Sequence, residues 1–113
     1  MFLVRDGSPE VTAHFPDDFF DFVYLDARHD YTSVLTDLAA FWPKVKRGGI
    51  IAGHDFRDAF VYDANDWLVQ PDGSRHPEGK AVRGAVQDFA GLVGRQVVVT
   101  TEDPAYPTWM MRK

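Results

Sequence analysis

The chain contains no cysteine among its 113 residues, which excludes disulfide bonds and thiolate metal sites. No apolar run approaches the roughly 20 residues that a transmembrane helix needs, and the segment "MFLVRDGSPE" lacks the apolar middle of a signal peptide. A surplus of positive charge is also missing, since the formal net charge is -5 and the lysines and arginines are scattered. These absences favour a cytoplasmic protein that acts on small molecules, with no nucleic-acid partner and no membrane.

Apolar residues make up 45% of the chain, which is enough for a packed core, and the length suits one domain over residues 1–113. The nearly all-apolar stretch Phe19–Leu25 predicts a strand covered on both faces. A helix capped by Thr32 or Ser33 follows, because apolar residues recur at helical spacing at Val34, Leu35, Leu38, Phe41 and Trp42. Gly48 and Gly49 predict a turn before another buried strand that ends at Gly53. The order strand, helix, strand predicts a right-handed βαβ unit.

The flanking segments extend this pattern. Phe2–Arg5 is a short strand candidate, and Ser8 followed by Pro9 is typical of a helix start. Residues 56–79 predict a long loop over the strand ends, and a second amphipathic helix begins near Val82. The last two strands, 95–101 and 107–113, are joined by a short connection and should pair antiparallel. The expected fold is α/β, with a mostly parallel Rossmann-like sheet, a reversed C-terminal strand and helices on the faces.

Chemically active side chains follow both buried strands of the βαβ unit. Asp26 ends the first strand, and His54 with Asp55 ends the next. Ligands of open parallel sheets bind at the carboxyl ends of strands, and neighbouring strands lie about 4.8 Å apart. We therefore expect Asp26, His54 and Asp55 to share a crevice that can hold a divalent cation such as Mg²⁺. His29 lies nearby and is a candidate general base, since histidine ordinarily titrates at about pH 6.5.

Simpler interpretations of these residues stay open. In the alternative interpretation, Asp26 caps the next helix and has no other role. Asp30 is better interpreted as a cap or turn residue than as a ligand. His54 can be a loop histidine whose hydrogen bonds are satisfied locally. His14 and His76 have no partner signal in the sequence and are expected at the surface.

Residues 21–56, "DFVYLDARHDYTSVLTDLAAFWPKVKRGGIIAGHDF", resemble the second half of class I S-adenosylmethionine-dependent methyltransferases. The combination of Asp-x-x-His-x-Tyr with Gly-Gly-x4-His-Asp is similar to the small-molecule O-methyltransferase branch of that family. "AVRGAVQDFA" resembles the helix after the family's substrate loop, and "PTWMMRK" resembles its closing strand. The resemblance implies methyl transfer from S-adenosylmethionine to an oxygen of a small-molecule acceptor.

The resemblance also implies residue roles. Asp26 matches a metal ligand of the catechol-type enzymes, and His54 with Asp55 replaces the Asp-Asn pair that completes their metal site. His29 occupies the position of their catalytic lysine. Asp6, Gly7 and Ser8 fall where such enzymes contact the adenine ring, and three further residues fall beside the cofactor: Asp26, Ala27 and Arg28. The implied cofactors are S-adenosylmethionine and a divalent cation.

One departure from the family concerns its first half. In the family, a glycine-rich loop holds the methionine part of S-adenosylmethionine, and an acidic residue holds its ribose. Neither has a counterpart before Asp6. The strand that normally flanks residues 21–25 is missing with them, which would leave an apolar open edge. We expect a homo-oligomer formed through that edge, or Phe2–Arg5 in the vacated place. Two alternatives to an active methyltransferase follow: an inactive remnant that serves as an assembly module and, ranked lowest, a metal-dependent hydrolase.

Overall fold

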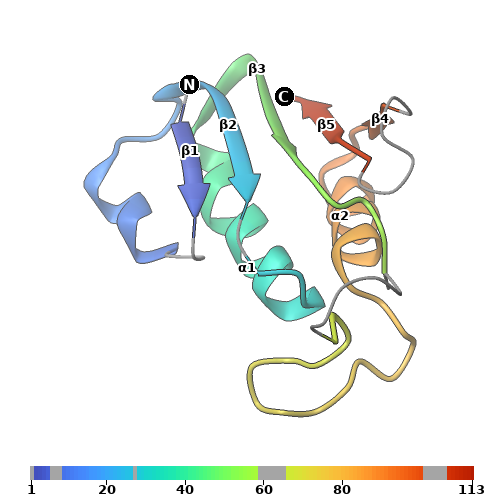
Figure 1. Cartoon of the computed structure of the whole chain (residues 1–113). Coiled ribbons are helices and arrows are strands. Elements are labelled where there is room, and N and C mark those ends of the chain that lie inside the picture. Colours follow the sequence, from blue (N-terminus) through green and yellow to red (C-terminus); the bar gives the residue numbers. More distant parts are fainter. Residues whose placement is uncertain (1, 6–8, 27, 59–65, 101–106) are drawn as a thin grey trace.

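The computed structural model contains a five-stranded sheet with the order β1-β2-β3-β5-β4 (Figure 1). Its strands are β1 (Phe2–Arg5), β2 (Phe20–Asp26), β3 (Val45–Gly53), β4 (Val98–Val99) and β5 (Trp109–Arg112). The structure describes residues 2–5, 9–26, 28–58, 66–100 and 107–113. Strands β1, β2 and β3 run parallel, whereas β5 is antiparallel to both β3 and β4. The predicted α/β sheet with a reversed C-terminal strand is confirmed.

Two α-helices, α1 (Tyr31–Phe41) and α2 (Val82–Val93), lie side by side behind the sheet in Figure 1 and contact each other. Two 3-10 helices, η1 (Pro9–His14) and η2 (Trp42–Lys44), flank α1. The apolar stripe of α1 packs inward, and Leu38 and Phe41 are fully buried. Within the described part of the chain, no helix has both the length and the apolarity needed to cross a membrane.

The two faces of the sheet are buried to different extents. Side chains on the face toward the helices are buried, as at Val23, Ile51 and Met111, which lie beside one another in register. The alternate residues Phe22 and Ile50 face the other way and are only half-buried. The prediction that residues 19–25 are covered on both faces is therefore wrong, because both α-helices pack on one face.

Two local boundaries also differ from prediction. Asp30, and not Thr32 or Ser33, caps α1, since its Oδ2 accepts a hydrogen bond of 3.0 Å from the backbone N–H of Ser33. The predicted turn at Gly48 and Gly49 lies inside β3, which begins at Val45. Gly48 adopts a left-handed φ of 80°, and the pairing of β3 with β2 shifts register there. Glycine tolerates this conformation, so the strand continues through an irregularity instead of ending.

Strand β1 takes the place beside β2 that was expected to be vacant. It pairs in parallel with β2, from Phe2 opposite Val23 to Arg5 opposite Asp26. This confirms the alternative in which residues 2–5 fill the place, and the edge of β2 is not open among the described residues. Self-association of the chain stays a prediction.

Segments near the C-terminal half match the prediction in outline. Residues 66–80 form no helix or named strand, although Val69 and Arg75 make an isolated bridge. Helix α2 has the predicted buried face, which includes Val82, Val86 and Phe89. The predicted strand over 95–101 is shorter, since only Val98–Val99 is a strand within the described residues.

Candidate functional site at the carboxyl ends of β2 and β3

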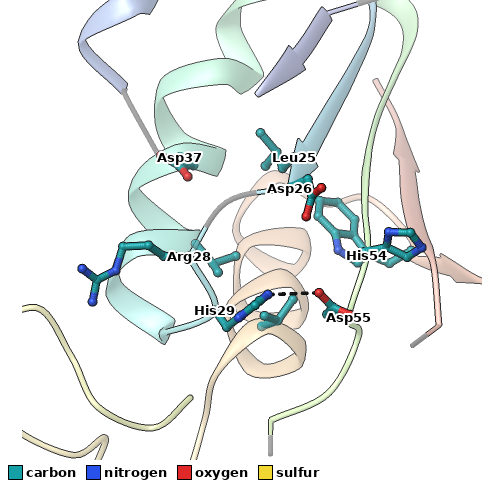
Figure 2. A pocket seen from close by; sticks show the side chains of 10 residues that line it. Leu25, Asp26, Arg28, His29, Asp37, His54 and Asp55 are labelled. Atoms are coloured by element: carbon teal, nitrogen blue, oxygen red, sulfur yellow. Dashed lines mark hydrogen bonds and ion pairs between the residues drawn. The ribbon is translucent and has the colours of Figure 1, made fainter. Parts of the chain in front are cut away.

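A small pocket, open to solvent, lies at the carboxyl ends of β2 and β3. Because Leu25 pairs with Gly53 in register, the residues that follow each strand emerge at the same edge of the sheet. Gly53 is required there, since a Cβ would lie 2.7 Å from the carbonyl oxygen of Leu25 and 2.8 Å from the Trp109 ring. Six polar side chains line the pocket (Figure 2): Asp26, Arg28, His29, Asp37, His54 and Asp55.

His29 and Asp55 form a polar contact within this pocket. The His29 Nε2 lies 3.0 Å from the Asp55 Oδ2, although the residues are 26 positions apart (Figure 2). Their side chains are 30% and 15% exposed, so the pair is shielded but reachable from solvent. Asp55 adopts a left-handed φ of 62°, which is uncommon for a residue other than glycine and tends to occur at functional sites. The sequence predicted both residues for the site but not their contact.

Trp67 supports the His29 ring from the long loop. The two rings stack with centroids 4.4 Å apart and an interplanar angle of 24°, and Trp67 is only 3% exposed. The loop is tied to the start of α1, because the backbone N–H of Thr32 donates a 3.0 Å hydrogen bond to the Gln70 side chain. The structure thus brings the tryptophan of the predicted long loop onto the candidate base. Tyr62, in the same loop, lies outside the described residues.

A second polar cluster holds this loop against both helices. The Tyr31 hydroxyl donates a 2.8 Å hydrogen bond to Asp88, and the Lys80 ammonium lies 3.1 Å from the same carboxylate. The hydrogen bond to Asp88 raises the pKa of Tyr31 and lowers that of Asp88. His76 had no partner signal in the sequence and was expected at the surface. It is half-buried, and its Nδ1 accepts hydrogen bonds of 3.2 Å from the backbone N–H groups of Lys80 and Glu78, which organises the end of the loop.

Asp30 and Arg28 connect the pocket to the start of α1. The Arg28 Nε lies 2.8 Å from the Asp30 Oδ1, and the Asp30 side chain is 3% exposed whereas that of Arg28 is 54% exposed. Asp30 therefore serves both as helix cap and as ion-pair partner, in agreement with its simpler interpretation. Of the residues expected near the cofactor, Asp26 and Arg28 line the pocket, whereas Asp6, Gly7, Ser8 and Ala27 lie outside the described residues.

The three predicted metal ligands are not gathered around one point. His54 is exposed and meets the Tyr24 ring edge-on at 5.6 Å, whereas Asp55 contacts His29. Burial, and next the charge of Asp26, raises the pKa of that tyrosine. In the residues that the structure describes, no group of three or more His, Asp or Glu side chains is arranged to hold a metal ion. The donor set therefore does not fit a cation in this arrangement.

Two buried polar groups in the pocket wall were not singled out from the sequence. Asp37 is 4% exposed, and burial, followed by the charges of Asp30 and Glu10, raises its pKa from 3.8 to about 6. The signal was its spacing, because a residue three after Val34 on a helix falls on the same, inward face. The indole Nε1 of Trp109 is buried and has no hydrogen-bond partner among the described residues. No pattern in the sequence predicted that this indole N–H would lack a partner.

Comparison with known families gives a match in the first half of the chain. Residues 1–56 match a family model described as "Methyltransferase domain". A curated S-adenosylmethionine synthase from Synechocystis sp. is 31% identical over 104 residues, which is 88% of this chain and 21% of that protein. The chain thus spans about a fifth of that curated relative, and the activity in its name is not carried over.

Solved structures with a similar fold include three proteins of low sequence identity. A protein from Corynebacterium glutamicum aligns with a TM-score of 0.55 and 16% identity, over 93% of this chain and 44% of that chain. An O-methyltransferase from Bacillus cereus in complex with SAH has a TM-score of 0.51 and 14% identity, over 93% and 46%. The MycE methyltransferase of the mycinamycin biosynthetic pathway, in complex with Mg and SAH, has a TM-score of 0.51 and 18% identity, over 93% and 28%. The chain covers less than half of each of these structures.

Proposed function

We propose that this chain, a member of the class I S-adenosylmethionine-dependent methyltransferases, transfers a methyl group to an oxygen of a small-molecule acceptor. The observation that carries the proposal is the 3.0 Å contact between His29 and Asp55 inside the pocket at the strand ends. A carboxylate next to a histidine is a suitable arrangement for removing a proton from a hydroxyl group.

In the proposed mechanism, His29 takes the proton of the acceptor hydroxyl as the oxygen forms its bond to the methyl carbon. The carbon–sulfur bond of the methyl donor breaks in the same step, and the proton passes later from His29 to solvent. The Asp55 carboxylate stabilises the imidazolium that forms, through its contact with Nε2. Trp67 fixes the plane of the ring by stacking on it, so the base is oriented before the acceptor arrives.

The described part of the pocket fits a positively charged methyl donor. S-adenosylmethionine would supply a methyl group made electrophilic by its sulfonium charge. Three carboxylates line the pocket against one arginine, and that arginine is already paired with Asp30. Asp26 and Arg28 would contact the cofactor from the end of β2, and we propose that Asp6, Gly7, Ser8 and Ala27 contribute from residues outside the described part.

A divalent cation at Asp26, His54 and Asp55 is the less favoured version of this proposal. Asp55 would have to leave His29 and join two side chains that are not arranged as metal ligands with it. We expect methyl transfer to proceed at a similar rate after chelation with EDTA and after addition of Mg²⁺. A large, saturable activation by Mg²⁺ would restore the metal-assisted version.

The experiment that tests the proposal has two parts. Calorimetry with S-adenosylmethionine, with and without Mg²⁺, measures whether the chain binds the cofactor. Mass spectrometry then follows methyl transfer to a panel of phenols and aliphatic alcohols, with the His29→Gln variant as the matched control. We expect binding, and a methylated product that the variant fails to form. Absence of cofactor binding in both conditions would reject an active enzyme for this chain.

A second candidate is an assembly role without catalysis, favoured by the sheet face away from the helices. Phe22, Ile50 and Met110 on that face are only half-buried, and Val98 is 58% exposed. The homo-oligomer expected from the sequence would bury such surface. Light scattering combined with the cofactor titration separates the candidates, since an oligomer that does not bind S-adenosylmethionine supports the assembly role.

A further inference from the structure

Asp37 is a buried acid that takes no part in the proton transfer proposed above. It belongs to the inward face of α1, is 4% exposed and lines the same pocket as His29 and Asp55. No hydrogen bond or ion pair of its carboxyl group occurs among the residues that the structure describes. Buried carboxylates are ordinarily paired, because removing an ionised group from water without a partner is costly. Within the described part of the chain, the carboxyl group therefore lacks the partner that its burial calls for.

The charges around Asp37 make a cation the fitting partner. Its neighbours Asp30 and Glu10 are both acidic, and after burial they are the next causes of its raised pKa. Arg28, which lines the same pocket, is paired with Asp30 at 2.8 Å. The described side chains provide no neighbouring positive charge for Asp37. A positively charged ligand group would therefore offset both the desolvation of its carboxylate and the repulsion from the neighbouring carboxylates.

A second buried group independently indicates a ligand in this pocket. Trp109 is 1% exposed and lines the pocket, and its Nε1 is the buried side-chain donor that lacks a partner in the described part of the chain. An unsatisfied buried donor costs free energy that a bound oxygen would recover. The pocket lining thus includes a hydrogen-bond donor and a carboxylate that have no partner among the described residues.

We propose that Asp37 and Trp109 form an acceptor subsite that binds a small molecule with an ammonium group distant from its reacting hydroxyl. This inference rests on the proposed function, since it assigns the acceptor class of the same pocket. Asp37 lies seven residues beyond Asp30, which is about 10 Å along the helix axis at the usual rise. Figure 2 shows it set back along α1 from the His29–Asp55 pair. The acceptor is therefore an extended amine-bearing alcohol or phenol: its hydroxyl lies at His29, its ammonium at Asp37, and the Trp109 N–H donates to an oxygen of the ligand.

The test uses two probes that differ only in the ammonium group, tyramine and 4-ethylphenol. Calorimetry or ligand-observed NMR measures their dissociation constants without cofactor, for the wild type and for Asp37→Asn, which keeps the size of the side chain. We expect tyramine to bind the wild type at least about tenfold more tightly than 4-ethylphenol, and to lose that advantage in the variant. Glu10→Gln is the matched control, because it removes a nearby negative charge from a residue that does not line the pocket; a change below about twofold is expected there.

A pH series provides a second measurement. The tyramine advantage should shrink on going from pH 8 to pH 5, as Asp37 becomes neutral. Because His29 and His54 also line the pocket, only the part of the change that disappears in Asp37→Asn is assigned to Asp37. Equal affinity of the two probes, unchanged tyramine affinity in the variant, or no binding of either probe would overturn the inference. Because the probes are titrated without cofactor, that failure would leave methyl transfer dependent on His29 untouched.

Discussion

Two His-Asp pairs follow neighbouring strands, and they are used in opposite ways. After β2, His29 enters the pocket while Asp30 is buried as the cap of α1. After β3, Asp55 enters the pocket while His54 is exposed beside Tyr24. The contact that forms is crossed, joining the histidine of the first pair to the aspartate of the second at 3.0 Å. Identical residue types thus take different roles because one pair starts a helix and the other follows a left-handed turn.

The largest expected effect distinguishes the two histidines. His29→Gln should lower the rate of methyl transfer by about 10²–10³-fold, the usual contribution of a positioned general base. His54→Gln should lower it by less than about threefold, since that ring is exposed and meets Tyr24 rather than His29. Steady-state kinetics on purified variants measures both. Equal losses would contradict the crossed pair, and a loss at His54 that depends on Mg²⁺ would favour a cation.

The next effect distinguishes the two aspartates. Asp55→Asn keeps a residue that tolerates the left-handed backbone but removes the charge beside His29. We expect kcat to fall by about 10–100-fold while KM changes little, because the imidazolium is stabilised only as the proton moves. The same substitution at Asp30 should instead reduce the free energy of unfolding. If Asp55→Asn raised KM and left kcat unchanged, Asp55 would bind the acceptor and not position the base.

A smaller effect concerns Asp37, the buried acid of α1 that lines the same pocket. Its pKa is raised by burial to about 6, so the folded state binds a proton that the unfolded state releases between about pH 4 and 6. The ionised group therefore destabilises the fold above pH 6, and stability falls as the pH rises through that window. Asp37→Asn should stabilise the protein by about 2 kcal/mol at pH 8 and by almost nothing at pH 4. Urea unfolding at both pH values measures this, and an equal gain at both would assign it to packing.

The smallest effect tests the capping role of Asp30. Asp30→Ala removes the acceptor of the Ser33 N–H and the partner of Arg28, and should cost about 1 kcal/mol of unfolding free energy. Asp30→Asn should recover most of that loss, because asparagine is also a good N-cap. Thermal or urea unfolding of the two variants is sufficient. An equal loss in both would mean that the ion pair with Arg28, and not the cap, stabilises the start of α1.

Many elements of the fold could be predicted because their signals are local. The helical spacing of Val34, Leu38 and Phe41 predicted α1, and the apolar run before Asp26 predicted β2. Boundaries were less accurate where residues compete for one task, as Asp30 did with Thr32 and Ser33 for the cap. The half-buried face of the sheet could not be predicted. An apolar run indicates that a strand can be buried, but it does not indicate on which face of the sheet the helices pack.

The sequence by itself determined several side chains of the pocket, although not Asp37, because a residue that ends a parallel strand must lie at the carboxyl edge of the sheet. Asp26, His29, His54 and Asp55 were found in that way, together with the family resemblance. Only the tertiary structure decided which of them touch, since side-chain direction depends on backbone angles and on packing partners from distant segments. The left-handed φ of Asp55 and the stacking of Trp67 are two such decisions. They bring a carboxylate and an aromatic ring against His29.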